Sequence, residues 1–319
     1  IVYDLTGKTV YPSFIDIYGP DYGIKAASST GPPSGSSAAV PAAPAERVAD
    51  YWNDCINASF DVTEEFISDP SQASDYRQAG FGAVVAFKAD GIARGTSALV
   101  STADGKANNL ILKNRASANY SLSKGRSYDA NPVSQFGYFS LLRQLNYDVE
   151  WYKKIPAGYF HDDGLEAYSK NSSLPQIFEV SDKLEMLRVD NTGSEFGIKY
   201  IIKGTGDEYQ TLSEIKNAGI PLIIPVNFPD PPNGKDPYDA ISVSYSALKH
   251  YELAPSNLAM VSREGLPFAI TSDDLKKRTD FLANLKKALK NGLTEKDALK
   301  ALTYTPASMV GAADIVGAL

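Results

Sequence analysis

The sequence has few of the residues that bind metals or cross-link chains. Its 319 residues include one cysteine, Cys55, and two histidines, His161 and His250. A single cysteine excludes a disulfide within the chain and a cysteine-rich metal cluster. Neither histidine follows a predicted strand, and the two are not spaced as a pair of ligands. We therefore interpret both as surface or packing residues.

Several other features are also missing. No run of about 18 consecutive apolar residues is present, so no membrane span is expected. The net charge of −7 argues against a nucleic-acid partner, because such a partner requires a concentrated basic face. The sequence lacks a G-x-G-x-x-G motif after an early strand, a P-loop and a G-x-S-x-G motif. Their absence disfavours a dinucleotide-binding fold, a P-loop nucleotide site and a serine hydrolase.

Apolar runs and helical patterns alternate along most of the chain. Strands are predicted at 14–17, 81–89, 97–102, 108–114, 174–180, 198–204, 220–228 and 266–274. Helices are predicted at 134–154, 182–197, 209–219 and about 240–251, and two more close the chain, the second beginning at Thr294. This alternation predicts right-handed βαβ units, an α/β fold and a parallel sheet. The number of units favours a (β/α)8 barrel as a single domain over residues 1–319.

One segment breaks the alternation. Residues 24–47 are rich in alanine, serine, proline and glycine and show no period. Such a composition cannot bury a core, so we interpret the segment as a flexible insertion at the surface. A lid over a site is the alternative.

In a barrel of this kind, functional residues follow the strands. The candidates at those places are Asp16, Tyr18, Pro20, Lys88, Asp90, Glu179, Lys203, Asn227 and Asp273. Glu179, Lys203 and Asp273 are the carboxylates and the amine best suited to chemistry. For Asp273 there is also a purely structural interpretation, because "TSDDLKKR" has the pattern of a helix start and aspartate is a good N-cap.

Both ends of the sequence resemble a known family. "GKTVYPSFIDIY" is similar to the "GK-x-V-x-PGFID-x-H-x-H" opening of the amidohydrolase superfamily. These metal-dependent hydrolases include imidazolonepropionase-like and N-acetylglucosamine-6-phosphate deacetylase-like enzymes. "LPFAITSDD" resembles the eighth-strand segment, and "NGLTEKDALKALTYTPASMVGAADIVGAL" resembles the C-terminal helices. "AGFGAVVAFKADGIARGTSALV" and "EFGIKYIIKGT" resemble interior segments.

The resemblance implies a (β/α)8 barrel of the metal-dependent hydrolase type, which usually carries a small β-sandwich built from both chain ends. Little or none of that sandwich is expected in this sequence. Since the sequence also begins without methionine, we expect the barrel to be part of a longer polypeptide.

The resemblance also implies where metal ligands would fall. The histidine pair of the first strand corresponds to Tyr18 and Pro20, and the histidines of the fifth and sixth strands correspond to Glu179 and, within one residue, Lys203. Only the aspartate of the eighth strand, Asp273, is retained. The family uses zinc or another divalent metal, and a catalytic zinc needs about three protein ligands. We therefore expect no bound metal, and the hypothesis follows that the Lys203 ammonium replaces it between Glu179 and Asp273.

Three functions remain open from the sequence. The favoured one is a degenerate hydrolase barrel, or pseudoenzyme, that supports or contacts the rest of its own polypeptide. The second is an active hydrolase of non-peptide C–N bonds with an atypical metal site and Asp273 as catalytic proton acceptor. The third is a binding module that holds a sugar or a peptide-like molecule in the barrel mouth. By resemblance, a bacterial periplasmic or cell-envelope location is expected.

Overall fold

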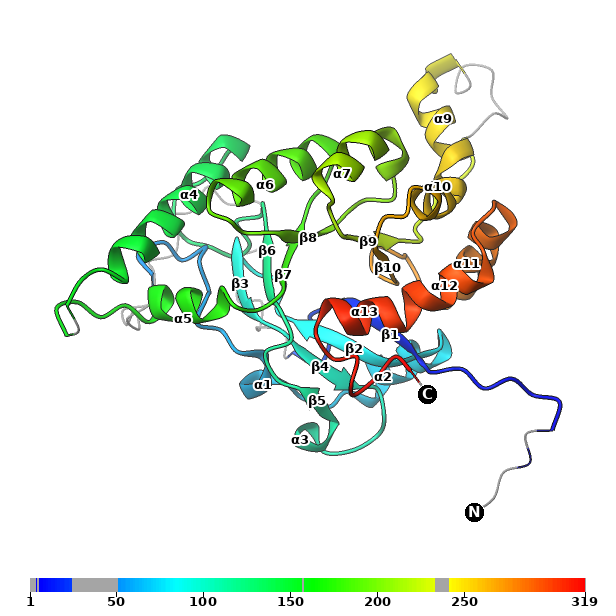
Figure 1. The fold of residues 1–319 in the computed structure, drawn as a ribbon, viewed down its shortest axis with the longest axis horizontal. Coiled ribbons are helices and arrows are strands. Elements are labelled where there is room, and N and C mark those ends of the chain that lie inside the picture. Colours follow the sequence, from blue (N-terminus) through cyan, green and yellow to red (C-terminus); the bar gives the residue numbers. More distant parts are fainter. Residues whose placement is uncertain (1–3, 5, 25–50, 157, 233–240, 319) are drawn as a thin grey trace, which may run out of the picture.

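Strands and helices alternate along the chain, as the sequence predicts (Figure 1). The computed structural model describes residues 4, 6–24, 51–156, 158–232 and 241–318. The strands are β1 (Phe14–Pro20), β2 (Phe81–Phe87), β3 (Ala93–Thr96), β4 (Ala98–Ser101), β5 (Ile111–Lys113), β6 (Ala118–Ser121), β7 (Gln176–Glu179), β8 (Tyr200–Lys203), β9 (Leu222–Pro225) and β10 (Phe268–Thr271).

The helices lie between and after the strands. They are α1 (Val62–Glu65), α2 (Pro70–Gln78), α3 (Ala107–Leu110), α4 (Gln135–Tyr152), α5 (Asp163–Asn171), α6 (Lys183–Glu195), α7 (Leu212–Ala218), α9 (Tyr245–Leu253), α10 (Asn257–Arg263), α11 (Phe281–Lys290), α12 (Glu295–Leu302) and α13 (Tyr304–Met309). Short 3-10 turns occur at Glu208–Gln210, Ala254–Ser256 and Arg278–Asp280. In the described part of the chain, no helix combines the length and the apolar character needed to cross a bilayer.

The strands form two sheets. The first has the order β1-β2-β4-β5, with β1 parallel to β2, and the second has the order β10-β9-β8-β7-β6-β3. In the second sheet, β6 to β10 are all parallel and neighbours in sequence are neighbours in space. Helices connect these strands on the outer side, in the manner of βαβ units (Figure 1). The predicted α/β class is confirmed.

The side chains of the strands alternate between two apolar layers, as strand geometry requires. One layer packs against the helices. The other joins both sheets, since Ile17 of β1 and Val85 of β2 share a cluster with Ile177, Ile223 and Ala269 of the second sheet. Residues of α13 belong to the same cluster. The inner faces of the two sheets therefore form one core.

The two sheets meet where β1 lies beside β10. Side chains make the connection there, because the Thr271 hydroxyl donates to Asp16 Oδ1 at 2.6 Å and to the Tyr18 carbonyl at 3.2 Å. Among the described residues, the strand pairings give these two sheets and not one continuous ladder, so they do not show the closure of the predicted barrel. The pairs β2–β4, β3–β6 and β4–β5 are antiparallel, whereas the sequence predicts a parallel sheet.

Some local predictions differ from the structure. The segment predicted as a strand at 108–114 begins as the helical turn α3 and contributes only the short strand β5. Helix α5, capped by Asp162, has no counterpart in the prediction. The insertion predicted at 24–47 lies outside the described residues except for Ile24, which forms a bridge with Phe66.

The shared inner core generates a stability prediction. Ile177 is 0% exposed between the sheets, whereas Ile241 is 82% exposed. We expect Ile177→Ala to lower the free energy of unfolding by about 2–5 kcal/mol, because it removes buried methyl groups and leaves a cavity. Ile241→Ala, the matched control, should change it by less than about 0.5 kcal/mol. Urea unfolding of both variants measures the difference, and equal values would contradict the assignment of the core.

Candidate functional site

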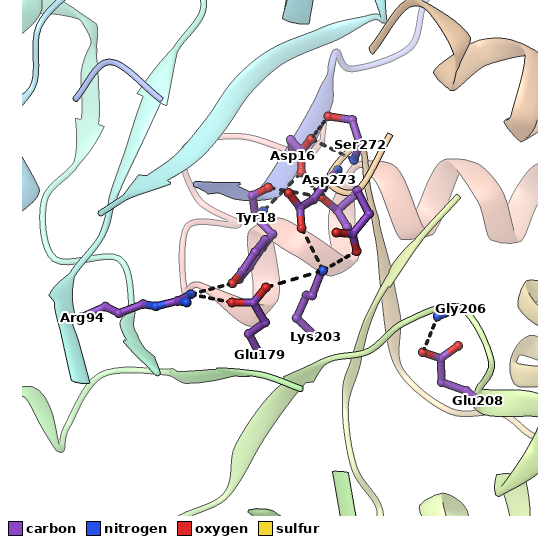
Figure 2. Close-up of polar contacts among 11 residues, drawn as sticks. Asp16, Tyr18, Arg94, Glu179, Lys203, Gly206, Glu208, Ser272 and Asp273 are labelled. Carbon is purple, nitrogen blue, oxygen red and sulfur yellow. Dashed lines mark hydrogen bonds and ion pairs between the residues drawn. The ribbon is translucent and has the colours of Figure 1, made fainter. Parts of the chain in front are cut away.

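The carboxyl ends of the parallel strands bring together residues that are far apart in the sequence (Figure 2). Tyr18 comes from β1, Glu179 is the last residue of β7, and Lys203 is the last residue of β8. Asp273 follows the end of β10 by two residues. Because β7, β8, β9 and β10 run in one direction, their carboxyl ends meet at one edge of the fold. Four of the five predicted site residues thus lie in one cluster.

Lys203 is the centre of this cluster. Its side chain is 3% exposed, and its Nζ lies 2.8 Å from Asp273 Oδ2, 2.5 Å from Asp274 Oδ2 and 3.9 Å from Glu179 Oε1. Burial would lower the pKa of the Lys203 ammonium, but Asp273 and Asp274 raise it above the usual lysine value. Lys203 therefore carries its positive charge at neutral pH.

The sequence did not predict the second cation of the cluster. Arg94, on β3, is 5% exposed and donates from Nη1 to Glu179 Oε2 at 2.7 Å and to the Tyr18 hydroxyl at 3.0 Å. Burial would raise the pKa of Glu179, but Arg94 and Lys203 outweigh it and hold that pKa below the usual glutamate value. Burial raises the pKa of the Tyr18 phenol well above its usual value, so Tyr18 stays neutral. An arginine within the apolar run "DGIARGTSALV" was the available signal.

Asp273 and Asp274 face Lys203 from a turn and not from a helix. Asp274 has a left-handed backbone conformation, with φ of 64°. The backbone N–H of Asp273 donates to Thr271 Oγ1 at 3.1 Å. The next helical turn begins at Arg278. The interpretation of Asp273 as a helix N-cap is therefore wrong. Burial raises the pKa of Asp273, while Lys203 opposes that rise.

Asp16 lies beside the cluster and is hydrogen-bonded to the segments that carry Tyr18 and Asp273. Its carboxylate is 0% exposed and accepts four hydrogen bonds, from Tyr18 N, Thr271 Oγ1, Ser272 N and Ser272 Oγ. Burial raises the pKa of Asp16, and the four hydrogen bonds that its carboxylate accepts oppose that rise. These hydrogen bonds join Asp16 to Tyr18 in β1 and to Thr271 and Ser272 at the end of β10 (Figure 2). Asp16 therefore positions the segments that carry Tyr18 and Asp273.

The remaining candidates lie outside this network. Pro20 ends β1 and has no side-chain donor or acceptor. Lys88 lies over the Phe60 ring at 4.7 Å, Asp90 accepts from Arg126 N at 2.8 Å, and Asn227 is exposed. His161 is exposed and its Nε2 lies 2.7 Å from Asp163 Oδ1, and His250 Nδ1 lies 3.1 Å from the Tyr209 hydroxyl.

A cavity of about 420 Å³ opens above the cluster. Ser121, Glu179 and Lys203 line it as the last residues of their strands, and Arg94 of β3, Asp274 and Glu185 of α6 also contribute to the lining. Ser181 donates to Glu185 from both its backbone N and its hydroxyl, each at 2.7 Å. The charged network is therefore accessible to a small polar molecule.

These residues do not fit a zinc ion. The Lys203 ammonium, which has no lone pair to give, lies among the three carboxylates that would have to supply the ligands. Within the described ranges, no group of three or more histidine, cysteine, aspartate or glutamate side chains is arranged to hold a metal ion.

Comparison with known proteins supports the fold. No protein-family model and no curated protein matches the sequence. Among solved structures, an amidohydrolase from Thermotoga maritima is 16% identical, with a TM-score of 0.68 over 97% of this chain and 78% of its own. A prolidase complexed with N-methylphosphonate-L-proline is 12% identical, with a TM-score of 0.46 over 99% of this chain and 78% of its own.

The first of these matches defines the class. The chain is an α/β protein, and its fold is that of an amidohydrolase. The resemblance to the amidohydrolase superfamily predicted from the sequence is thus confirmed at the level of the fold.

The burial of Lys203 generates a prediction. Lys203→Met would leave Glu179, Asp273 and Asp274 without their shared cation, so we expect it to lower the free energy of unfolding by about 3–5 kcal/mol at neutral pH. Lys276→Met is the matched control, because its ion pair with Asp230 at 2.7 Å is exposed and should contribute nothing measurable. Chemical unfolding tests both, and equal stabilities would contradict the role of Lys203.

The lowered pKa of Glu179 predicts a pH dependence. Its ionised form contributes stability that is fully present above the unfolded-state pKa of about 4.3 and is lost as the pH falls through the lower folded-state value. We expect Glu179→Gln to be less stable than the wild type at neutral pH and the difference to shrink below about pH 4.3. Urea unfolding across this range measures it, with the exposed Glu150→Gln as control. A pH-independent difference would argue against the Arg94–Glu179 pair.

Proposed function

We propose that this chain is an amidohydrolase-like (β/α)8 barrel in which fixed side-chain cations have replaced the catalytic metal. On this proposal it is a pseudoenzyme domain with a structural or partner-binding role. The barrel is supported by the apolar cluster that the inner faces of both sheets share, and by the hydrogen bonds of Asp16 and Thr271 between β1 and β10.

One observation carries the proposal. Lys203 Nζ lies 2.8 Å from Asp273, the only family ligand position that keeps its residue type, and 2.5 Å from Asp274. On the other side of the cluster, Arg94 pairs with Glu179 at 2.7 Å. Two cations that belong to the chain thus offset most of the negative charge that would attract a divalent cation.

The same contacts argue against hydrolysis. Metal-dependent hydrolysis needs a metal with an open position that activates water. An atypical hydrolase would need Asp273 as the proton acceptor, yet that carboxylate is bound to Lys203 and is 16% exposed. These contacts therefore support a pseudoenzyme over the alternative, an active hydrolase of C–N bonds.

Two roles fit a barrel of this kind. It can support the rest of a longer polypeptide, which by the family resemblance would lie in a bacterial cell envelope. It can also hold a small polar ligand at its mouth, which is favoured by the 420 Å³ cavity that Arg94, Glu179 and Lys203 line.

Zinc content tests the proposal. After purification in a zinc-containing buffer and dialysis, we expect elemental analysis to find well below one zinc per chain, because Lys203 fills the centre of the ligand positions. We also expect no hydrolysis of N-acylated amino acids or Xaa-Pro dipeptides above the buffer rate. One tightly bound zinc per chain, or metal-dependent turnover, would overturn the proposal.

A restored site is the positive control. The variant Tyr18→His, Pro20→His, Glu179→His and Lys203→His returns the family ligands beside Asp273. If these positions correspond to the ligand positions of the family, the variant should retain the circular dichroism spectrum of the wild type and gain bound zinc. A folded variant that binds no zinc would show that the assignment of positions is wrong.

A further inference from the structure

A second cavity lies away from the barrel mouth, between α4 and the segments at 52–53 and 131–134. Its volume is about 500 Å³, and its lining shares no residue with the cavity above Lys203. Trp52, Asn53, Asn131, Pro132, Leu141 and Gln144 form its main walls. A concave site of this size falls within the range of about 300–1,000 Å³ that small-molecule sites occupy.

Hydrogen bonds hold the walls of this cavity in place. The Tyr51 hydroxyl donates to Asp148 Oδ2 at 2.7 Å, and Gln144 Nε2 donates to Asp148 Oδ1 at 2.5 Å. Asn53, which is 2% exposed, donates from Nδ2 to the Asn131 carbonyl at 3.0 Å and accepts from Cys55 N at 3.1 Å. The segment carrying Trp52 is thereby fixed both to α4 and to the segment at 131–134. The cavity is preformed, which reduces the entropy cost of binding.

The lining combines a flat aromatic surface with neutral polar groups. The Trp52 side chain is 58% exposed and packs against the Tyr51 ring at 5.5 Å between centroids. Pro132 and Leu141 are buried and add apolar surface. Among the described residues, no hydrogen bond engages the Asn131 side-chain amide or Gln144 Oε1. A ligand can therefore accept from Asn131 Nδ2 and donate to Asn131 Oδ1 and Gln144 Oε1.

Among the residues that the structure describes, no aspartate, glutamate, lysine or arginine lines the cavity. An ionised ligand would therefore lose its hydration there without gaining a counter-charge. The lining instead matches a molecule with one apolar face and several neutral hydroxyl or amide groups. A pyranose ring has this chemistry, because its axial C–H bonds form an apolar face that packs on an indole and its hydroxyls exchange hydrogen bonds with amides.

We propose that this cavity binds a neutral hexopyranose sugar, with Trp52 as the stacking platform and Asn131 and Gln144 as hydrogen-bonding partners. The proposal goes beyond the one made for the barrel mouth and does not depend on it. It assigns the chain a carbohydrate-binding site at the side of α4.

The sequence allows a direct measurement, because Trp52 and Trp151 are its two tryptophans. In the Trp151→Phe variant, Trp52 is the sole reporter of tryptophan fluorescence. We expect a saturable change in this fluorescence on titration with at least one of N-acetylglucosamine, maltose and cellobiose. The Trp52→Phe variant, whose remaining Trp151 lies outside the cavity lining, should show no change with the same sugar.

Calorimetric titration of the sugar that responds then tests the assigned residues. Trp52→Ala should raise its Kd about tenfold or more, and Asn131→Ala, at an exposed position, about fivefold. Glucuronate, the charged counterpart, should bind more weakly than the neutral sugars. The proposal is overturned if none of the three sugars changes the Trp52 signal, or if glucuronate binds as tightly as the neutral sugars. It is also overturned if neither substitution alters the Kd, or if a proline-rich peptide binds and the sugars do not.

Discussion

The charge on Lys203 is the constraint on which the site depends. A lysine whose side chain is 3% exposed loses most of the hydration of its ammonium, and the fold can contain that charge only if carboxylates and hydrogen bonds compensate for the loss. Asp273 and Asp274 supply the close contacts, and Glu179 lies farther away at 3.9 Å. Since Glu179 is only partly satisfied by Lys203, it pairs closely with Arg94, and Arg94 in turn reaches the Tyr18 hydroxyl. The charged side chains of three strands and one turn therefore form one network of ion pairs.

The geometry of this set depends on Asp16, which contributes no charge contact to Lys203 in the described structure. Its four hydrogen bonds fix Tyr18 N and the backbone and hydroxyl of Ser272 relative to one another. The Ser272 hydroxyl also accepts from Arg278 Nε at 2.9 Å, and the guanidinium of Arg278 lies 3.7 Å from the centre of the Tyr76 ring. The turn that presents Asp273 and Asp274 is thus supported independently of the ion pairs.

The sequence predicts the α/β class well because βαβ units leave strong local signals, namely apolar runs followed by amphipathic segments. It also predicts that Glu179, Lys203 and Asp273 are the residues to consider, since they follow three such runs. It does not predict Arg94 or Asp274. Arg94 lies in a four-residue strand whose partner β6 is distant in sequence, and Asp274 depends on a left-handed turn that removes the expected helix start. Both depend on tertiary contacts that no local pattern encodes.

The residue types at positions 18, 179 and 203 are electrostatically compatible only as a set. A lysine beside intact metal ligands would repel a divalent cation, and the carboxylates without either cation would repel one another. Tyr18 completes the arrangement, because a neutral phenol gives Arg94 an acceptor without adding a negative charge, and the Lys203 ammonium lies 5.4 Å from the centre of its ring. Each of these residues removes an electrostatic cost that another creates. The changes in the free energy of unfolding caused by substitutions of these residues should therefore not add. Lys203 Nζ and Glu179 Oε1 are 3.9 Å apart, so we expect Arg94 and Asp273 to carry most of the coupling between the two residues.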